Sequence, residues 1–276
     1  MLRIAHLSDI HFGGELKDAV EAAVTAVAGL TPTVTVVTGD LTLNGLPREF
    51  RAAQRWLARL PQPRVVTPGN HDTPYWNLLL RALTPFERYR RYIGAAGGAA
   101  FDAPGLSLRA VNSARGAQPR PNWSKGAISL AAVERLDWKE DVRVFACHHP
   151  LVDIEGAPVT GGVHRGEKAA ALLSRQNVDL LLSGHVHVPF ALPVGDSDKV
   201  CFVIGAGTLS LRTRGTPPSF STIDVAPAAF EVTVHAWEAG RFTPLEPVRL
   251  PRALTAAAAT VPPQGVTLDG PPATTG

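Results

Sequence analysis

Short apolar runs rich in Val, Leu and Ile alternate with amphipathic stretches over the first two thirds of the chain. The pattern predicts strands at Leu2 to Leu7, Val34 to Thr38, Arg64 to Thr67, Val142 to Cys147 and Val178 to Ser183. It predicts helices at Lys17 to Ala28, Pro47 to Leu60, Ser129 to Leu136 and Gly166 to Gln176. Alternation of this kind is typical of an α/β layered fold.

The pattern changes near Val200. Three further strand patterns, Val200 to Ile204, Ser219 to Val225 and Phe230 to Trp237, leave no room for crossover helices. We expect antiparallel strands that complete a second sheet. From about Pro251 the chain consists of Ala, Thr, Pro and Gly with almost no charge, a composition that does not bury a core. We therefore expect one domain over residues 1–250 and a flexible tail over 251–276.

Composition narrows the class of protein. The 276 residues are 45% hydrophobic and 18% charged, which is enough apolar surface for a large core. The formal charge of +3 is too mild to indicate a nucleic-acid polymer as partner, although it does not repel a small anion. The two cysteines, Cys147 and Cys201, do not make a disulfide framework and favour a reducing compartment.

The chain shows neither a secretory signal nor a membrane-spanning stretch. Its N-terminus enters a strand pattern directly, without a charged segment followed by a long apolar run. No stretch approaches the roughly 20 apolar residues of a membrane span. We expect a cytoplasmic protein, and the sequence leaves its oligomeric state open.

Five short motifs each follow a predicted strand and carry the candidate chemistry. They are Asp9-Ile10-His11, Gly39-Asp40, Gly69-Asn70-His71-Asp72, His148-His149-Pro150 and Gly184-His185-Val186-His187. Six of the nine histidines lie in them. Ligands of α/β proteins bind at the carboxyl ends of strands, so we expect these side chains to gather at one sheet edge. Gathered there, carboxylate, amide and imidazole groups would hold two metal ions side by side.

Each motif taken alone can also be explained without a metal ion. The occurrence of all five motifs in order favours the metal site. In a strand, side chains at i and i+2 share a face, so Asp9 and His11 can reach one ion; alone, the pair is an Asp-x-His that arises by chance. The Asp40 carboxylate has two oxygens and can bridge two cations, although turn aspartates are common. Five such motifs in a row after buried strands are improbable by chance.

The third motif supplies three different groups. Asn70 offers a neutral carbonyl oxygen to a metal. His71 is expected to point toward the substrate, and Asp72 to accept a proton from the imidazole and orient it.

The last two motifs contribute imidazoles. One of His148 and His149 is expected to bind metal, and the residues alone do not say which. His185 and His187 are two apart and share a face, with Gly184 allowing close approach of the backbone.

The sequence resembles the calcineurin-like metallophosphoesterase superfamily, whose pattern is D-x-H, G-D, G-N-H-[DE], H and G-H-x-H. The match spans about Leu2 to Pro189, with every motif position filled in order. The resemblance implies a four-layer sandwich of two mixed β-sheets flanked by helices. It implies one metal held by Asp9, His11, Asp40 and His187, and a second held by Asp40, Asn70, His148 and His185. His148 is preferred because the family ligand lies two residues before the proline.

Subfamily features point to small diesters. The run Gly39 to Gly45 lacks the Asp-Arg of protein Ser/Thr phosphatases, and Thr42 stands where lipid-A pathway pyrophosphatases and double-strand-break nucleases usually have an aromatic residue. The chain looks most like bacterial class III cyclic nucleotide phosphodiesterases and their glycerophosphodiester-cleaving relatives. Alternatives are a phosphomonoesterase or nucleotide pyrophosphatase on the same site, or a binding module that has lost catalysis.

The expected reaction is metal-assisted hydrolysis of a phosphate ester. Two cations lower the pKa of a bridging water, and the resulting hydroxide attacks phosphorus. His71 is the natural proton donor to the leaving oxygen. The ligand set has no thiolate and suits Mn, Fe, Zn or Co, and the resemblance favours an Fe/Mn pair.

The segment Thr73 to Gly94 follows His71 directly. Asn77 and Arg81 are the candidate substrate contacts within it. Its later residues Phe86, Tyr89, Arg90 and Ile93 have the spacing of a core-facing helix stripe.

Overall fold

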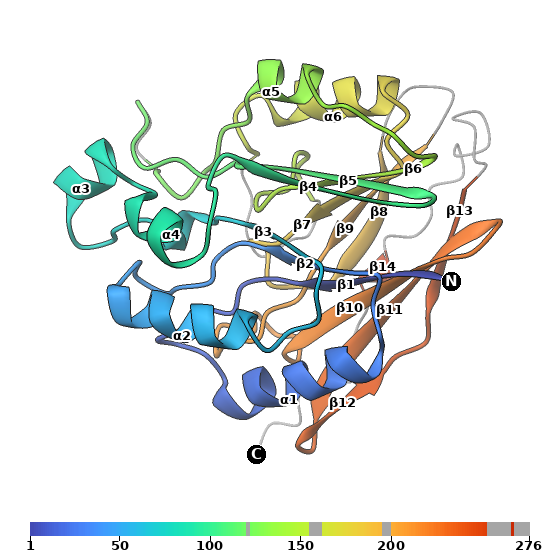
Figure 1. The fold of residues 1–276 in the computed structure, drawn as a ribbon, viewed down its shortest axis with the longest axis horizontal. Helices are drawn as coiled ribbons and strands as arrows, with labels where there is room; N and C mark the ends of the chain where they lie inside the picture. The colour runs from blue at the N-terminus through green and yellow to red at the C-terminus, as the bar shows by residue number, and fades with distance from the viewer. Residues whose placement is uncertain (120–121, 155–161, 195–199, 253–265, 268–276) are drawn as a thin grey trace.

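Two mixed sheets lie face to face between layers of helices (Figure 1). The structure, a computed structural model, describes residues 1–119, 122–154, 162–194, 200–252 and 266–267. Within these residues each sheet has seven strands. The architecture confirms the expected four-layer α/β sandwich.

The first sheet has the order β12-β11-β10-β1-β2-β3, with β13 paired to β11. Its strands are β1 (Leu2–Leu7), β2 (Val34–Thr38), β3 (Arg64–Thr67), β10 (Ser219–Val225), β11 (Ala229–Glu238), β12 (Arg241–Pro244) and β13 (Val248–Pro251). β1, β2 and β3 run parallel, so their carboxyl ends meet at one edge.

The second sheet has the order β14-β8-β9-β7-β6-β5-β4. Its strands are β4 (Gly98–Ala103), β5 (Leu106–Val111), β6 (Val142–Ala146), β7 (Leu180–Ser183), β8 (Phe190–Val194), β9 (Cys201–Gly205) and β14 (Val266–Thr267). β5, β6, β7 and β9 are parallel, and β4 and β8 are antiparallel to their neighbours.

Helices cover the outer faces of both sheets. They are α1 (Lys17–Gly29), α2 (Pro47–Leu57), α3 (Leu78–Leu83), α4 (Glu87–Tyr92), α5 (Leu130–Glu134) and α6 (Gly166–Arg175), with a 3₁₀ turn η1 (Asn70–Asp72). α1 and α2 lie over the first sheet, and α5 and α6 over the second (Figure 1). Three apolar layers result, one between the sheets and one beneath each helix layer, as a four-layer sandwich requires. Among the described residues, no helix is both long and apolar enough to cross a bilayer.

The strand after β8 differs from its prediction. We expected all three late strands to be antiparallel and to complete a second sheet. β10 and β11 are antiparallel but join β1 in the first sheet, whereas β9 lies in the second sheet and pairs parallel with β7. The antiparallel strand β8 reverses the chain, which then returns between β8 and β7. This reversal replaces the crossover helix whose absence had suggested an antiparallel strand.

Two further regions differ from the sequence prediction: the β4–β5 hairpin and the C-terminal end of the domain. The β4–β5 hairpin begins in a Gly- and Ala-rich stretch with little β-propensity. Most of the predicted tail, residues 253–265 and 268–276, lies outside the described residues. Pro251 ends β13, and Val266–Thr267 pairs with β8 as β14, so strand pairing extends past the predicted boundary. The division into one domain and a tail stays a prediction.

Candidate metal centre

The five motifs meet between the carboxyl ends of β1, β2 and β3 in one sheet and of β6 and β7 in the other. We had expected a single sheet edge, and the site instead draws its side chains from both sheets. Five of the predicted ligands have a left-handed backbone: Asp9 (φ 55°), His11 (50°), Asp40 (49°), His185 (69°) and His187 (67°). Such φ values are uncommon for residues other than glycine and cluster at functional sites.

These backbone angles correct the reason given for Asp9 and His11 sharing an ion. β1 ends at Leu7, so neither residue is in extended strand, and the i, i+2 rule does not apply. The two side chains converge because both residues lie in left-handed turns. The turns are held by backbone hydrogen bonds from Asp9 N to Gly39 O and from His11 N to Asp40 O.

Glycines allow the segments to approach closely at two points. A Cβ on Gly184 would overlap Ser8 Oγ and crowd the Asp9 carboxylate. A Cβ on Gly69 would overlap the Asp40 carboxylate. The glycines of these two motifs are therefore needed for the carboxylates to stand where they do.

The first cluster brings together Asp9, His11, Asp40 and His187, whose ligand atoms all lie within 4.8 Å of one another. His187 Nδ1 donates to the carbonyl oxygen of Arg212 at 2.7 Å. In the neutral ring Nε2 is then an acceptor, and it lies 3.1 Å from Asp9 Oδ1, a buried oxygen without a hydrogen bond. Two acceptors in contact are satisfied by a cation between them.

The second cluster contains His148, His149 and His185, and Asn70 and Asp40 face it. His148 Nδ1 donates to the Thr38 carbonyl at 2.7 Å, so Nε2 of the neutral ring is an acceptor. That Nε2 lies 3.2 Å from Asn70 Oδ1 and 3.3 Å from Asp40 Oδ2. Burial lowers the pKa of His148, but the charges of Asp40 and Asp9 outweigh burial and raise it to about 9. A metal ion held by this cluster would take the place of that proton.

Asp40 belongs to the first cluster and contacts His148 of the second. Its Oδ1 accepts the His71 backbone N–H at 2.8 Å, and its Oδ2 lies 3.3 Å from His148 Nε2 and 3.7 Å from His11 Nε2. Burial raises the pKa of this carboxyl, but His148 and His71 outweigh burial and hold the pKa well below its usual range. The residue is therefore a charged, fixed carboxylate placed between two groups of imidazoles.

The ring nitrogens of His149 face Ser113 and Ser124, whereas Nε2 of His148 faces Asn70 and Asp40. Its Nδ1 lies 2.9 Å from Ser113 Oγ, and its Nε2 donates to the Ser124 carbonyl at 2.8 Å. His185 lies beside His148, with ring centroids 5.2 Å apart, and its backbone N–H donates to Asp9 Oδ2 at 2.8 Å. Burial raises the pKa of the Cys147 thiol to about 12, so this neighbour is not a thiolate. The geometry supports His148 as the ligand of its motif.

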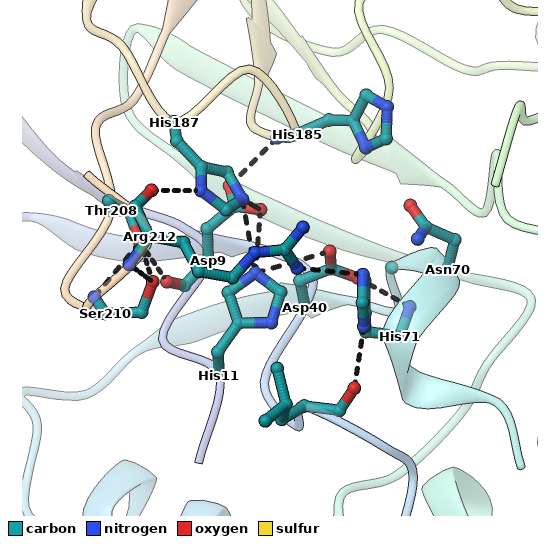
Figure 2. A network of polar contacts seen from close by, with 12 residues as sticks. Asp9, His11, Asp40, Asn70, His71, His185, His187, Thr208, Ser210 and Arg212 are labelled. Atoms are coloured by element: carbon teal, nitrogen blue, oxygen red, sulfur yellow. Dashed lines mark hydrogen bonds and ion pairs between the residues drawn. The ribbon is translucent and has the colours of Figure 1, made fainter. Parts of the chain in front are cut away.

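His71 is half-buried and lies beside Asp40 and Asn70 (Figure 2). Its Nδ1 donates to the Leu43 carbonyl at 2.6 Å, and its ring meets that of His11 edge to face, with centroids 4.8 Å apart. Its Nε2 accepts from Nη1 of Arg212 at 3.2 Å. One ring nitrogen is thus fixed by the backbone, and the other faces the site.

Asp72 does not orient His71, contrary to our expectation. Its carboxylate accepts backbone N–H groups of Gly69 and Thr42, both at 2.9 Å, and of Leu41 at 3.2 Å. Burial and the charge of Asp40 raise its pKa to about 7, against the backbone hydrogen bonds. The residue ties the η1 turn to the Asp40 loop, and the Leu43 carbonyl takes the role we had assigned to it.

Asn77 and Arg81, the two residues predicted to contact substrate, form hydrogen bonds within the protein instead. The Asn77 side chain accepts the Leu80 N–H at 2.9 Å and caps α3. Arg81 is buried and donates to the carbonyl oxygens of Gly116 and Trp123. An arginine held in this way is not available to a phosphate, which corrects the prediction for Arg81.

The sequence reasoning missed the segment after β9. Thr208 Oγ1 donates to the Asp9 carbonyl at 2.6 Å, and Ser210 Oγ lies 2.8 Å from Thr208 Oγ1 (Figure 2). Arg212 then reaches His71. The available signal was a Gly-Ala-Gly-Thr run after a predicted strand, to which we assigned no role.

Asp9, His11, Asp40 and His187 form one group of possible metal ligands and His148, His149 and His185 form a second, and Asp40 of the first group contacts His148 of the second. At the strand ends of two facing mixed sheets, these groups define a protein with a candidate dinuclear metal site. The donors are carboxylate, amide oxygen and imidazole, which fits first-row transition metal ions. The model of the calcineurin-like phosphoesterase family matches residues 2–189, and the chain belongs to this family.

Two relatives agree with this assignment, and one solved structure shares the fold. A probable cyclic nucleotide phosphodiesterase of Synechococcus sp. is 26% identical over 204 residues, covering 68% of this chain and 74% of the relative. A glycerophosphodiester phosphodiesterase of Enterobacter lignolyticus is 25% identical over 202 residues, covering 67% and 70%. A purple acid phosphatase from yellow lupin shares the fold with a TM-score of 0.60 at 13% identity, over 99% of this chain and 57% of that chain.

Proposed function

We propose that this protein is a dinuclear-metal phosphodiesterase that hydrolyses small diesters such as cyclic nucleotides. The observation that supports it most is the pair of clusters that Asp40 connects, with His71 beside them. The two relatives named above are described as phosphodiesterases for cyclic nucleotides and for glycerophosphodiesters, which favours diesters over monoesters.

The proposed ligands follow from the site. Asp9, His11 and His187 would hold one ion, and Asn70, His148 and His185 the other, with Asp40 between them. When bound, such a pair supplies Lewis acidity to the phosphoryl oxygens and acidifies a water molecule. The oxygen and nitrogen donors suit Mn, Fe, Zn or Co, and an Fe/Mn pair is our first choice.

The chain's own residues complete the reaction. Water adds to phosphorus, and the bond from phosphorus to the leaving oxygen breaks. The attacking water releases a proton, and the leaving oxygen takes one up. Once Nε2 of His71 is protonated, the ring is placed to give that proton to the leaving oxygen, because the Leu43 carbonyl fixes Nδ1 and so the direction of the ring. His71 is attached directly to Asn70, which keeps the proton donor in register with the ligands.

A substrate panel tests this proposal. With Mn²⁺ added, bis-p-nitrophenyl phosphate should be hydrolysed with a kcat/KM at least about tenfold above that of p-nitrophenyl phosphate, and cyclic nucleotides or glycerophosphodiesters should release phosphomonoester. Faster hydrolysis of the monoester or of nucleotide pyrophosphates would replace the proposal with the corresponding activity. If protein that carries two equivalents of metal hydrolyses none of these esters, the result would indicate a binding module.

A further inference from the structure

Arg212 contacts the one ring nitrogen of His71 that the leaving group needs. Its Nη1 lies 3.2 Å from His71 Nε2, while the Leu43 carbonyl holds Nδ1 (Figure 2). With Nδ1 as donor, the neutral ring offers Nε2 as an acceptor, so the guanidinium donates to it. In this arrangement the arginine occupies the position that a leaving oxygen would take beside His71.

The backbone of Arg212 is fixed from both sides. Its N–H donates to Ser210 Oγ at 3.2 Å, and its carbonyl accepts Nδ1 of His187 at 2.7 Å. Ser210 is tied through Thr208 to the Asp9 carbonyl. The base of this side chain is thus anchored to two proposed ligands, whereas the side chain itself is exposed and able to move.

The charge of Arg212 has no carboxylate partner among the described residues. Its guanidinium contacts only an imidazole there, whereas Arg3 pairs with Asp224 and Arg109 with Asp102. A second cation, Arg214, follows two residues later, and burial and the charge of Arg212 both lower its pKa. A guanidinium without a carboxylate partner, in contact with His71 and with a second arginine two residues later, is a setting for an anion.

We propose that Arg212 is a phosphate-binding residue, which leaves His71 Nε2 for a non-bridging oxygen of the phosphoryl group when substrate enters. The inference rests on the proposed function, since it takes the phosphoryl group as the ligand. One movement then does two things: the guanidinium gains a charged acceptor in place of a neutral one, and Nε2 becomes free to take up the proton that it passes to the leaving oxygen. Substrate entry is thereby coupled to the readiness of the proton donor.

Phosphate binding by Arg212 would also affect the selectivity of the protein between monoesters and diesters. A phosphomonoester dianion carries more charge on its non-bridging oxygens than a diester monoanion, so it gains more from a cation at this point. Removing the charge should therefore reduce kcat/KM for p-nitrophenyl phosphate more than for bis-p-nitrophenyl phosphate. A purely structural role would lower both equally.

Binding of inorganic phosphate to Mn-loaded protein, measured by calorimetry, tests the inference without turnover. Arg212→Ala should weaken phosphate binding roughly 10- to 100-fold with metal content unchanged, and Arg212→Lys by less, because Lys keeps the charge without the planar fork. The control Arg249→Ala removes an exposed arginine of β13, paired with Glu231, and should bind phosphate like the wild type.

The outcomes separate this inference from the proposed function. Wild-type phosphate affinity in Arg212→Ala, or loss of its metal, would overturn the role of Arg212 even if the protein hydrolyses diesters. Arg212-dependent phosphate binding by a protein that hydrolyses no ester would uphold the role and overturn the function. Failure of the wild type to bind phosphate and to hydrolyse any ester would overturn both.

Discussion

Replacing Asp40 by Asn should abolish turnover and remove bound metal at the same time. Asn keeps an oxygen for the His71 N–H but places an NH₂ group, a donor, where Oδ2 faces His148 and His11. Metal ions that share a carboxylate lose their common ligand and a negative charge. A metal pair supplies several kcal/mol of transition-state stabilisation, so kcat/KM should fall by at least about a thousandfold.

The measurement pairs elemental analysis with diester hydrolysis on the same preparation. Asp224→Asn is the matched control, because Asp224 pairs with Arg3 at the opposite end of β1. The Asp224→Asn variant should bind two equivalents of metal and hydrolyse diesters at the wild-type rate. An Asp40→Asn protein that retains two equivalents and hydrolyses diesters at the wild-type rate would show that Asp40 does not bridge the ions.

His71→Ala should slow turnover by about 10²- to 10⁴-fold while the metal content persists. The contact of His71 with the metal ligand Asp40 runs through its backbone N–H, which alanine retains. Only the imidazole, and with it the proton for the leaving oxygen, is lost.

The leaving group provides the internal control for this variant. p-Nitrophenolate departs without a proton, so the loss should be small for bis-p-nitrophenyl phosphate and large for a diester with an alkyl leaving group. An equal loss for both esters would assign His71 to binding or structure instead of proton transfer. An unimpaired rate with the alkyl diester would remove His71 from the reaction.

The sequence was sufficient to predict which residues form the clusters, because the chemistry of a metal site restricts residue type and because strand ends fix where the residues lie. Asp9, Asp40 and His148 each follow a run whose apolar pattern predicts a strand without knowledge of the fold. The choice of His148 over His149 came from family resemblance and stays a prediction: both histidines belong to the second cluster, and His148 is the one in contact with Asp40.

Other features depend on contacts between distant segments, which local patterns do not record. The residue that orients His71 is a backbone carbonyl, that of Leu43, and every residue has one. Asp72 was assigned that role because it is adjacent in sequence, yet its oxygens turn toward the Gly69 and Thr42 backbone. Arg212 was missed because its place depends on β9 joining β7, a pairing set by the whole sheet.

The central claim is that two ions lie side by side between the clusters, joined by Asp40. A crystal structure of Mn-loaded protein, with an anomalous difference map, tests it most directly. The account predicts two peaks about 3.5–4 Å apart, both in contact with Asp40, one ligated by Asp9, His11 and His187 and the other by Asn70, His148 and His185. A single peak, or peaks away from these residues, would contradict it.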